Sequence, residues 1–104
     1  MCIAYLAIDA HPDWPLFIAA NRDEFHARQA KFAAPWPQRP DIIAGIDCVA
    51  HGTWLGITRQ GRYAFLTNYR DLSSFKAQAP SRGELSSHYL EGRESPRDYA
   101  HRTA

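Results

Sequence analysis

Two short apolar runs open the chain, residues 2–8 and 16–20, and the segment between them limits how they can fold. That segment, residues 9–15, contains two aspartates and two prolines, which favour a turn over continued regular structure. Short apolar runs bounded by such residues are typical of β-strands. We therefore predict a β-hairpin that holds the N-terminus in a strand.

The middle of the chain combines a proline-rich stretch with further predicted strands. Proline cannot continue a central strand or the interior of a helix, and it occurs here as Pro35, Pro37 and Pro40. Residues 26–40 are therefore predicted to form an irregular loop across the surface. Strands are predicted at residues 42–46, 54–58 and 63–67, the last two joined as a hairpin through residues 59–62. The chain would then contain about five strands.

Two helices are predicted near the end of the chain. Ser81 and Glu84 have the spacing of a capping box, which predicts a helix over residues 82–91. Its inward face would be made by Leu85, Tyr89 and Leu90. Ser95 directly before Pro96 predicts the start of a second helix. The fold class predicted is α+β, with mostly antiparallel strands followed by two helices.

Charge and cysteine content narrow the function classes. Twelve basic residues against eleven acidic ones leave a net charge of +1 with the signs interspersed, so nucleic acid is not suggested as a partner. The apolar run at residues 3–8 is too short for a signal peptide or a membrane span. Two cysteines without a CxxC pair fit a reducing cytoplasm. Of these two, Cys48 is interpreted as a small buried hydrophobic residue.

Cys2 is the candidate nucleophile. Removal of Met1, which aminopeptidases perform when the next side chain is small, would leave Cys2 with both a thiol and a free α-amine. An α-amine has a reference pKa of about 7.7–8.0, so it can accept the thiol proton near neutral pH. One residue would then supply both nucleophile and base. The alternative is an ordinary structural cysteine in an edge strand.

Five short motifs follow one another along the chain. They read Met-Cys-Ile at 1–3, Ala-Asn-Arg-Asp-Glu-Phe at 20–25, Gly-Thr-Trp-Leu-Gly-Ile at 52–57, Leu-Thr-Asn-Tyr at 66–69 and Ser-Arg-Gly-Glu-Leu at 81–85. In this order they resemble the NRDE family, also called the transport and Golgi organisation protein 2 family. The resemblance implies a four-layer αββα fold related to the N-terminal nucleophile hydrolases that use cysteine.

An αββα fold normally needs two packed sheets and two helical layers, and therefore a longer chain than this. We expect residues 1–104 to form one incomplete domain, the N-terminal portion of that fold, with the C-terminal half missing. The final residues, 98–104, break off within a predicted helix that has no glycine or asparagine stop signal. Apolar strands without their partners would then associate with another chain.

Arg22 and Asp23 follow the second predicted strand, so pairing of the two strands would place them beside Cys2. A guanidinium there would favour the thiolate, and a carboxylate would orient the α-amine. The alternative is a solvated Arg–Asp pair of little energetic value. Related acylases of the choloylglycine and penicillin V type have a different Arg-to-Asp spacing, so the role of Arg22 transfers better than that of Asp23.

Asn68 is the candidate oxyanion-hole donor. The segment 61–68 is similar to the strand that ends in the oxyanion-hole asparagine of those acylases. An amide N–H aimed at a developing oxyanion can lower a barrier by about 2.7–4 kcal/mol. The alternative is an asparagine that merely ends a strand in a turn. Trp54 is expected in the core.

The function implied is hydrolysis of a non-peptide carbon–nitrogen bond, an amide of a small acyl compound, by Cys2 with Arg22, Asp23 and Asn68. The alternative is a non-catalytic binding or trafficking protein, since the family has been connected to haem mobilisation and secretory-pathway organisation. The five histidines show no metal-ligand spacing and there is no glycine-rich phosphate loop. Neither a metal nor another cofactor is expected.

Overall fold

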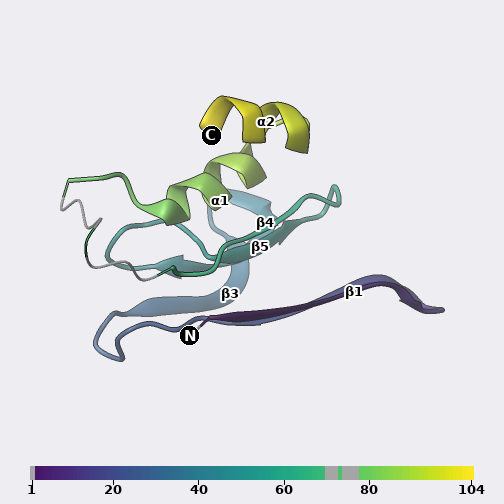
Figure 1. Cartoon of the computed structure of the whole chain (residues 1–104), viewed down its shortest axis with the longest axis horizontal. Coiled ribbons are helices and arrows are strands. Elements are labelled where there is room, and N and C mark those ends of the chain that lie inside the picture. Colours follow the sequence, from purple (N-terminus) through teal and green to yellow (C-terminus); the bar gives the residue numbers. More distant parts are fainter. Residues whose placement is uncertain (1, 70–72, 74–77) are drawn as a thin grey trace.

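The computed structural model describes residues 2–69, 73 and 78–104. It contains a two-stranded hairpin, a four-stranded antiparallel sheet and two helices (Figure 1). The strands are β1 (Ile3–His11), β2 (Trp14–Asn21), β3 (Ala30–Trp36), β4 (Arg39–Asp47), β5 (Leu55–Thr58) and β6 (Tyr63–Phe65). The helices are α1 (Arg82–Glu91) and α2 (Pro96–Thr103). This order of antiparallel strands followed by two helices confirms the predicted α+β class.

The predicted N-terminal hairpin is confirmed. β1 and β2 pair antiparallel in a register that sets Ile3 opposite Asn21 and Ile8 opposite Leu16. Both strands are longer than predicted and include part of the expected turn. This is possible because a bulge between Ile8 and His11 accommodates the residues that do not fit the regular pairing. Asp9 has a φ of 51° there, a conformation that aspartate tolerates better than most residues.

The prediction of an irregular loop over residues 26–40 is wrong for its second half. Residues 30–36 form β3, and Pro35 lies opposite Ile43 of β4. β3 is the edge strand of its sheet, where a residue without an N–H can be accommodated. Pro40 lies near the start of β4, ahead of the pairing with β5 that begins at Ile42. The described residues therefore contain six strands where the sequence predicted about five.

The four-stranded sheet follows the order β3-β4-β5-β6 and carries α1 on one side (Figure 1). The buried core is small, with Ile42 and Ala44 of β4 under Leu90 of α1. Gly56 permits this close approach, because a Cβ there would lie 2.7 Å from both Ala44 Cβ and Leu90 Cδ1. The predicted hairpin between β5 and β6 is confirmed, with Gly61 at a φ of 85° in its turn.

Helix α1 has the predicted bounds, but its inward face differs from the prediction. Ser81 caps it by accepting the N–H of Gly83 at 3.3 Å. The buried residues are Ser86, Ser87 and Leu90, whereas Leu85 is 47% exposed. The first turn of the helix lies against the backbone at Gly52, where a Cβ would be 2.5 Å from the Gly83 carbonyl carbon. Of the three residues predicted for the inward face, Leu90 is buried and Leu85 is not.

The far end of α1 is tied to the β5–β6 hairpin by Arg62. Its Nε and Nη2 donate to the Tyr89 carbonyl at 3.0 and 2.7 Å, and its guanidinium lies 3.9 Å from the centre of the Tyr89 ring. A cation at the C-terminal end of a helix complements the helix dipole. The second helix begins at Ser95–Pro96 as predicted, with Ser95 accepting the N–H of Asp98.

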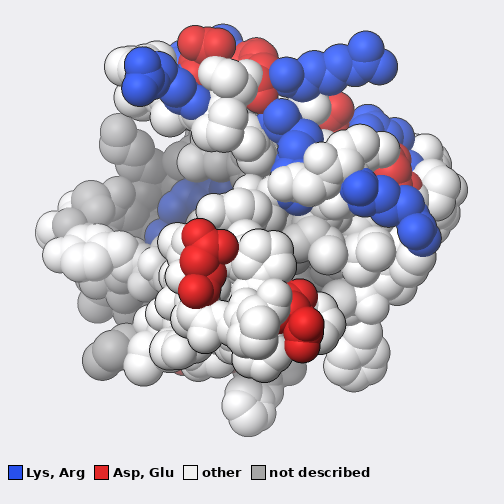
Figure 2. All heavy atoms as spheres, turned by 90° about the vertical axis from the view of Figure 1, so that its right-hand side faces the viewer, with Lys and Arg blue, Asp and Glu red and all other residues white. Residues whose placement is uncertain are grey.

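Charged side chains are unevenly distributed over the surface. In Figure 2 they gather at the height of the helices, while the lower part of the surface is mostly uncharged. The hairpin contributes to this difference, because Asp9 and Asp13 are the only Asp, Glu, Lys or Arg residues between positions 2 and 21. Several of its large apolar side chains are exposed, among them Ile3, Tyr5, Ile8, Trp14 and Phe17.

Candidate active site

A cleft of about 120 Å³ lies where the start of β1, the segment after β2, the end of β4 and the first turn of α1 meet. Its lining residues are Cys2, Arg22, Glu24, Arg28, Asp47, Gly52, Thr53, Trp54, Leu66, Asn68, Ser81, Arg82 and Gly83. Three of the four residues predicted for the site, Cys2, Arg22 and Asn68, are in this lining. All five sequence motifs contribute at least one residue to it.

The hairpin register positions Cys2. The Ile3 N–H donates to Asn21 Oδ1 at 2.9 Å, which ties the start of β1 to the end of β2. The chain then turns so that the backbone N–H of Asp23 donates to Cys2 Sγ at 3.3 Å. The residues that end the second strand thus lie beside Cys2, as the strand pairing predicted.

Arg22 lies in the cleft with its guanidinium directed to a carboxylate. Nη2 is 2.6 Å from Asp47 Oδ2 and 3.7 Å from Glu24 Oε2. The guanidinium also lies 4.5 Å from the centre of the Trp54 ring. Trp54, expected in the core, is half-buried and forms a wall of the cleft on which Arg22 stacks.

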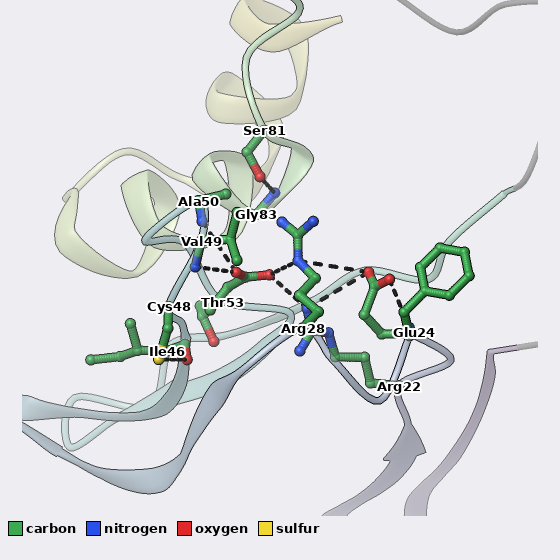
Figure 3. A network of polar contacts seen from close by, with 12 residues as sticks. Arg22, Glu24, Arg28, Ile46, Cys48, Val49, Ala50, Thr53, Ser81 and Gly83 are labelled. Atoms are coloured by element: carbon green, nitrogen blue, oxygen red, sulfur yellow. Dashed lines mark hydrogen bonds and ion pairs between the residues drawn. The ribbon is translucent and has the colours of Figure 1, made fainter. Parts of the chain in front are cut away.

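Asp47, which sequence reasoning did not select, is the centre of a polar network. Figure 3 labels its partners Arg22, Arg28, Val49 and Ala50. Oδ2 accepts from Arg22 and from Arg28 Nε at 2.7 Å, while Oδ1 accepts the backbone N–H groups of Val49 and Ala50. Burial alone would raise the pKa of Asp47, but the Arg28 hydrogen bond and the two backbone N–H groups outweigh burial and hold that pKa below its usual value. Asp47 is therefore ionised at neutral pH.

Arg28 and Glu24 complete this network. Arg28 Nε lies 3.9 Å from Glu24 Oε2, an i, i+4 pair. The hydrogen bond to Asp47 raises the pKa of Arg28 above its usual value, so its charge is permanent. Two guanidiniums thus share one carboxylate, which fixes the loop after β2 to the end of β4. This fixed loop is the one whose backbone contacts Cys2.

Asn68 contacts the same segment after β2. Its Nδ2 donates to the Asp23 carbonyl at 3.2 Å, so both polar groups of the Asp23 backbone are engaged near the thiol. An amide nitrogen carries two hydrogens, and this bond uses one of them. The arrangement brings the Cys2 thiol, the Asn68 amide and the Asp47 network into one small cleft.

The described residues offer no group of three or more His, Cys, Asp or Glu side chains that could hold a metal ion. Cys48 lies outside the cleft lining, with its Sγ 4.0 Å from the Ile46 carbonyl oxygen. No helix in the described ranges is both long and apolar enough to span a membrane.

Comparison with known proteins adds evidence that is independent of this geometry. The family model for Transport and Golgi organisation 2 matches residues 1–104. Over 97 residues the chain is 41% identical to the human "Transport and Golgi organization protein 2 homolog" and 38% identical to its cattle counterpart, in each case across 86% of this chain and 35% of the relative. The Drosophila melanogaster protein "Transport and Golgi organization protein 2" is 38% identical over 63 residues, 55% of this chain and 22% of the relative. The chain therefore spans about a third or less of the length of these curated relatives.

Proposed function

The chain belongs to the Transport and Golgi organisation 2 family, and on that premise we propose that it is a cysteine N-terminal nucleophile hydrolase acting on a non-peptide amide. One observation carries the proposal: the thiol of residue 2 opens into a cleft that also holds the Asn68 amide. Acyl transfer requires at least a nucleophile and a hydrogen-bond donor that can stabilise the oxyanion.

The proposed reaction begins after Met1 has been removed. The Cys2 amine takes the thiol proton, and the thiolate attacks the amide carbonyl to form the carbon–sulfur bond. Asn68 Nδ2 donates to the oxyanion of the tetrahedral intermediate. The carbon–nitrogen bond then breaks, the leaving amine takes the proton back from the Cys2 ammonium, and water hydrolyses the thioester. Arg22 and Asp23 would orient the Cys2 terminus.

The backbone N–H of Asp23 suits this chemistry, because its contact with the Cys2 sulfur at 3.3 Å fixes the position of the nucleophile. The network around Asp47 keeps that donor in place through Arg22 and Arg28. A reduced thiol is required throughout, so we place the protein in the cytoplasm.

A second candidate function is binding or trafficking without hydrolysis. The names of the relatives refer to transport and Golgi organisation, and a cleft lined by a partly exposed cysteine is compatible with ligand binding. Titration with haem tests the haem-mobilisation form of this candidate. A Soret shift that Cys2→Ala abolishes, together with no turnover of any acyl amide, would favour transport over catalysis.

Processing of the N-terminus tests the proposed hydrolase. Intact mass should show that Met1 is absent, and a limiting dose of iodoacetamide should label Cys2 before Cys48, because in the proposed mechanism the α-amine accepts the proton of the Cys2 thiol. Peptide mapping of the labelled protein measures the order. Retained Met1 would remove the amine-activated mechanism outright.

The exposed hairpin provides the basis for self-association. Ile8 and Trp14 are 67% and 61% exposed, and successive β1 residues alternate between the two faces of the hairpin, so both faces carry apolar side chains. Surfaces of this kind mark protein interfaces. We propose that a second copy of the chain covers the hairpin.

Ile8→Lys should shift the protein toward the monomer, since a lysine on the strand would place its charge in the interface. Sedimentation velocity over a range of concentrations measures the change. Leu85→Lys, a similar substitution at an exposed site on α1, is the control and should leave the association state unchanged. A wild-type protein that is monomeric at all concentrations would contradict the proposal.

A further inference from the structure

The cleft beside Cys2 contains more positive than negative side chains. Its lining includes three guanidiniums, those of Arg22, Arg28 and Arg82, against the carboxylates of Glu24 and Asp47. Asp47 is shared by two of the arginines. The internal network therefore leaves positive charge facing the cleft, which would favour a negatively charged ligand.

Arg28 is oriented for a further contact. Its Nε makes the bonds to Asp47 and Glu24, at 2.7 and 3.9 Å. Figure 3 shows its two terminal nitrogens pointing away from those carboxylates, toward the side where Ser81 and Gly83 lie. Within the described ranges, the side-chain hydrogen bond of Arg28 and the ion-pair distances given for it all involve Nε. A guanidinium held at Nε presents its remaining donors in a fixed fork that matches a carboxylate or a phosphate.

Arg82 is the third guanidinium of the cleft lining. It is the first residue of α1, and a cation in the first turn of a helix is disfavoured by the helix dipole. Its Nη1 donates to the Tyr69 carbonyl at 3.4 Å, a long contact with a neutral group. No carboxylate among the described residues pairs with it. Helix stability therefore does not account for an arginine at this position.

We infer that Arg28 and Arg82 bind an anionic group, a carboxylate or a phosphate, on the molecule whose reacting carbon lies at Cys2. The substrate class is then an amide that carries such a group. The amide part of this statement rests on the proposed function, whereas the anion site depends only on the arginines and their position beside the thiol.

Alkylation of Cys2 tests the anion site without requiring any turnover. Iodoacetate and iodoacetamide form the same carbon–sulfur bond and release the same iodide, but only iodoacetate carries a carboxylate. The measured quantity is the alkylation rate with iodoacetate divided by the rate with iodoacetamide. In the unsubstituted protein this ratio should be about tenfold higher at Cys2 than at Cys48, because the arginines bind the anionic reagent near the thiol. High salt should reduce this preference.

Arg82→Gln should remove most of the preference for iodoacetate at Cys2, and Arg28→Lys, which keeps the charge but loses the fork, should reduce it. The matched control is Arg97→Gln, which removes the same charge from the first turn of α2 and should change nothing. Inorganic phosphate and acetate, compared as competitors at equal ionic strength, distinguish the two anion chemistries by which one protects Cys2 better.

The outcomes separate this inference from the hydrolase proposal. The anion site would be overturned if the iodoacetate-to-iodoacetamide rate ratio were the same at Cys2 and Cys48. It would also be overturned if Arg82→Gln and Arg97→Gln reduced the preference for iodoacetate at Cys2 equally. Either result would count even if the protein hydrolyses amides. A preference for iodoacetate that only the cleft arginines support, in a protein that retains Met1 or hydrolyses no amide, would uphold the anion site and refute the hydrolase.

Discussion

Replacement of Cys2 by serine should lower the rate of amide hydrolysis at least about a thousandfold, because removal of a catalytic nucleophile commonly costs that much or more. A hydroxyl holds its proton far more tightly than a thiol, so the α-amine can remove it only during the attack itself, and an oxygen placed where the site fits a sulfur should react much more slowly. Serine is nearly the same size as cysteine and can accept the Asp23 N–H that now reaches Sγ. The fold should therefore be unchanged.

Two measurements are needed to interpret this result. Turnover of a panel of acyl amides, followed by mass spectrometry of the released amine, gives the rate, and thermal unfolding shows that Cys2→Ser is folded. Cys48→Ser is the matched control, because this second cysteine lies outside the cleft lining and should retain full activity. Activity of Cys2→Ala, which has no side-chain nucleophile, equal to that of the unsubstituted protein would exclude Cys2 as the nucleophile.

The parts of this site that could be predicted are those whose contacts join residues close to one another in the sequence. Cys2 and Asp23 could be brought together from the sequence, because two adjacent apolar runs with a turn between them have a natural antiparallel pairing. The capping serines Ser81 and Ser95 likewise act within their own helices, and both helix starts were predicted. Local signals of this kind depend only on neighbouring residues.

The contacts that were missed join distant parts of the chain. Asp47 directly follows the predicted strand 42–46 and resembles a turn residue. Nothing in the sequence around it indicates that Arg22 and Arg28, 25 and 19 positions away, both lie on its Oδ2. That convergence is set by the register of β4 and the course of the loop after β2. β3 was missed because Pro35 excludes a central strand but not an edge strand, and edge position is a property of the whole sheet.

Asp47→Asn should destabilise the fold by about 2–4 kcal/mol, since removing one partner of a largely buried ion pair leaves uncompensated charge behind. The asparagine would have the same shape and could still accept the backbone N–H groups of Val49 and Ala50. It would, however, leave Arg22 and Arg28 facing each other across a neutral amide. Urea or thermal unfolding measures the loss.

The matched control is Asp41→Asn. Asp41 also pairs with an arginine, at 3.0 Å from Arg39, but its side chain is more exposed than that of Asp47, 24% against 11%. Solvent screens an exposed pair, so its loss should be much smaller. Equal destabilisation by the two substitutions would show that the Asp47 network is no more important to the fold than a surface ion pair.

The stability lost in Asp47→Asn should depend on pH if the loss is electrostatic. Because the folded-state pKa of Asp47 is lowered, its carboxylate contributes stability that is fully present above its unfolded-state pKa and is lost as the pH falls through its folded-state pKa. The gap in unfolding free energy between the unsubstituted protein and Asp47→Asn should therefore be constant near neutral pH and shrink in acid. A gap that persists unchanged into strong acid would mean that the asparagine acts through packing, and the carboxylate would then not be what holds Arg22 and Arg28 beside Cys2.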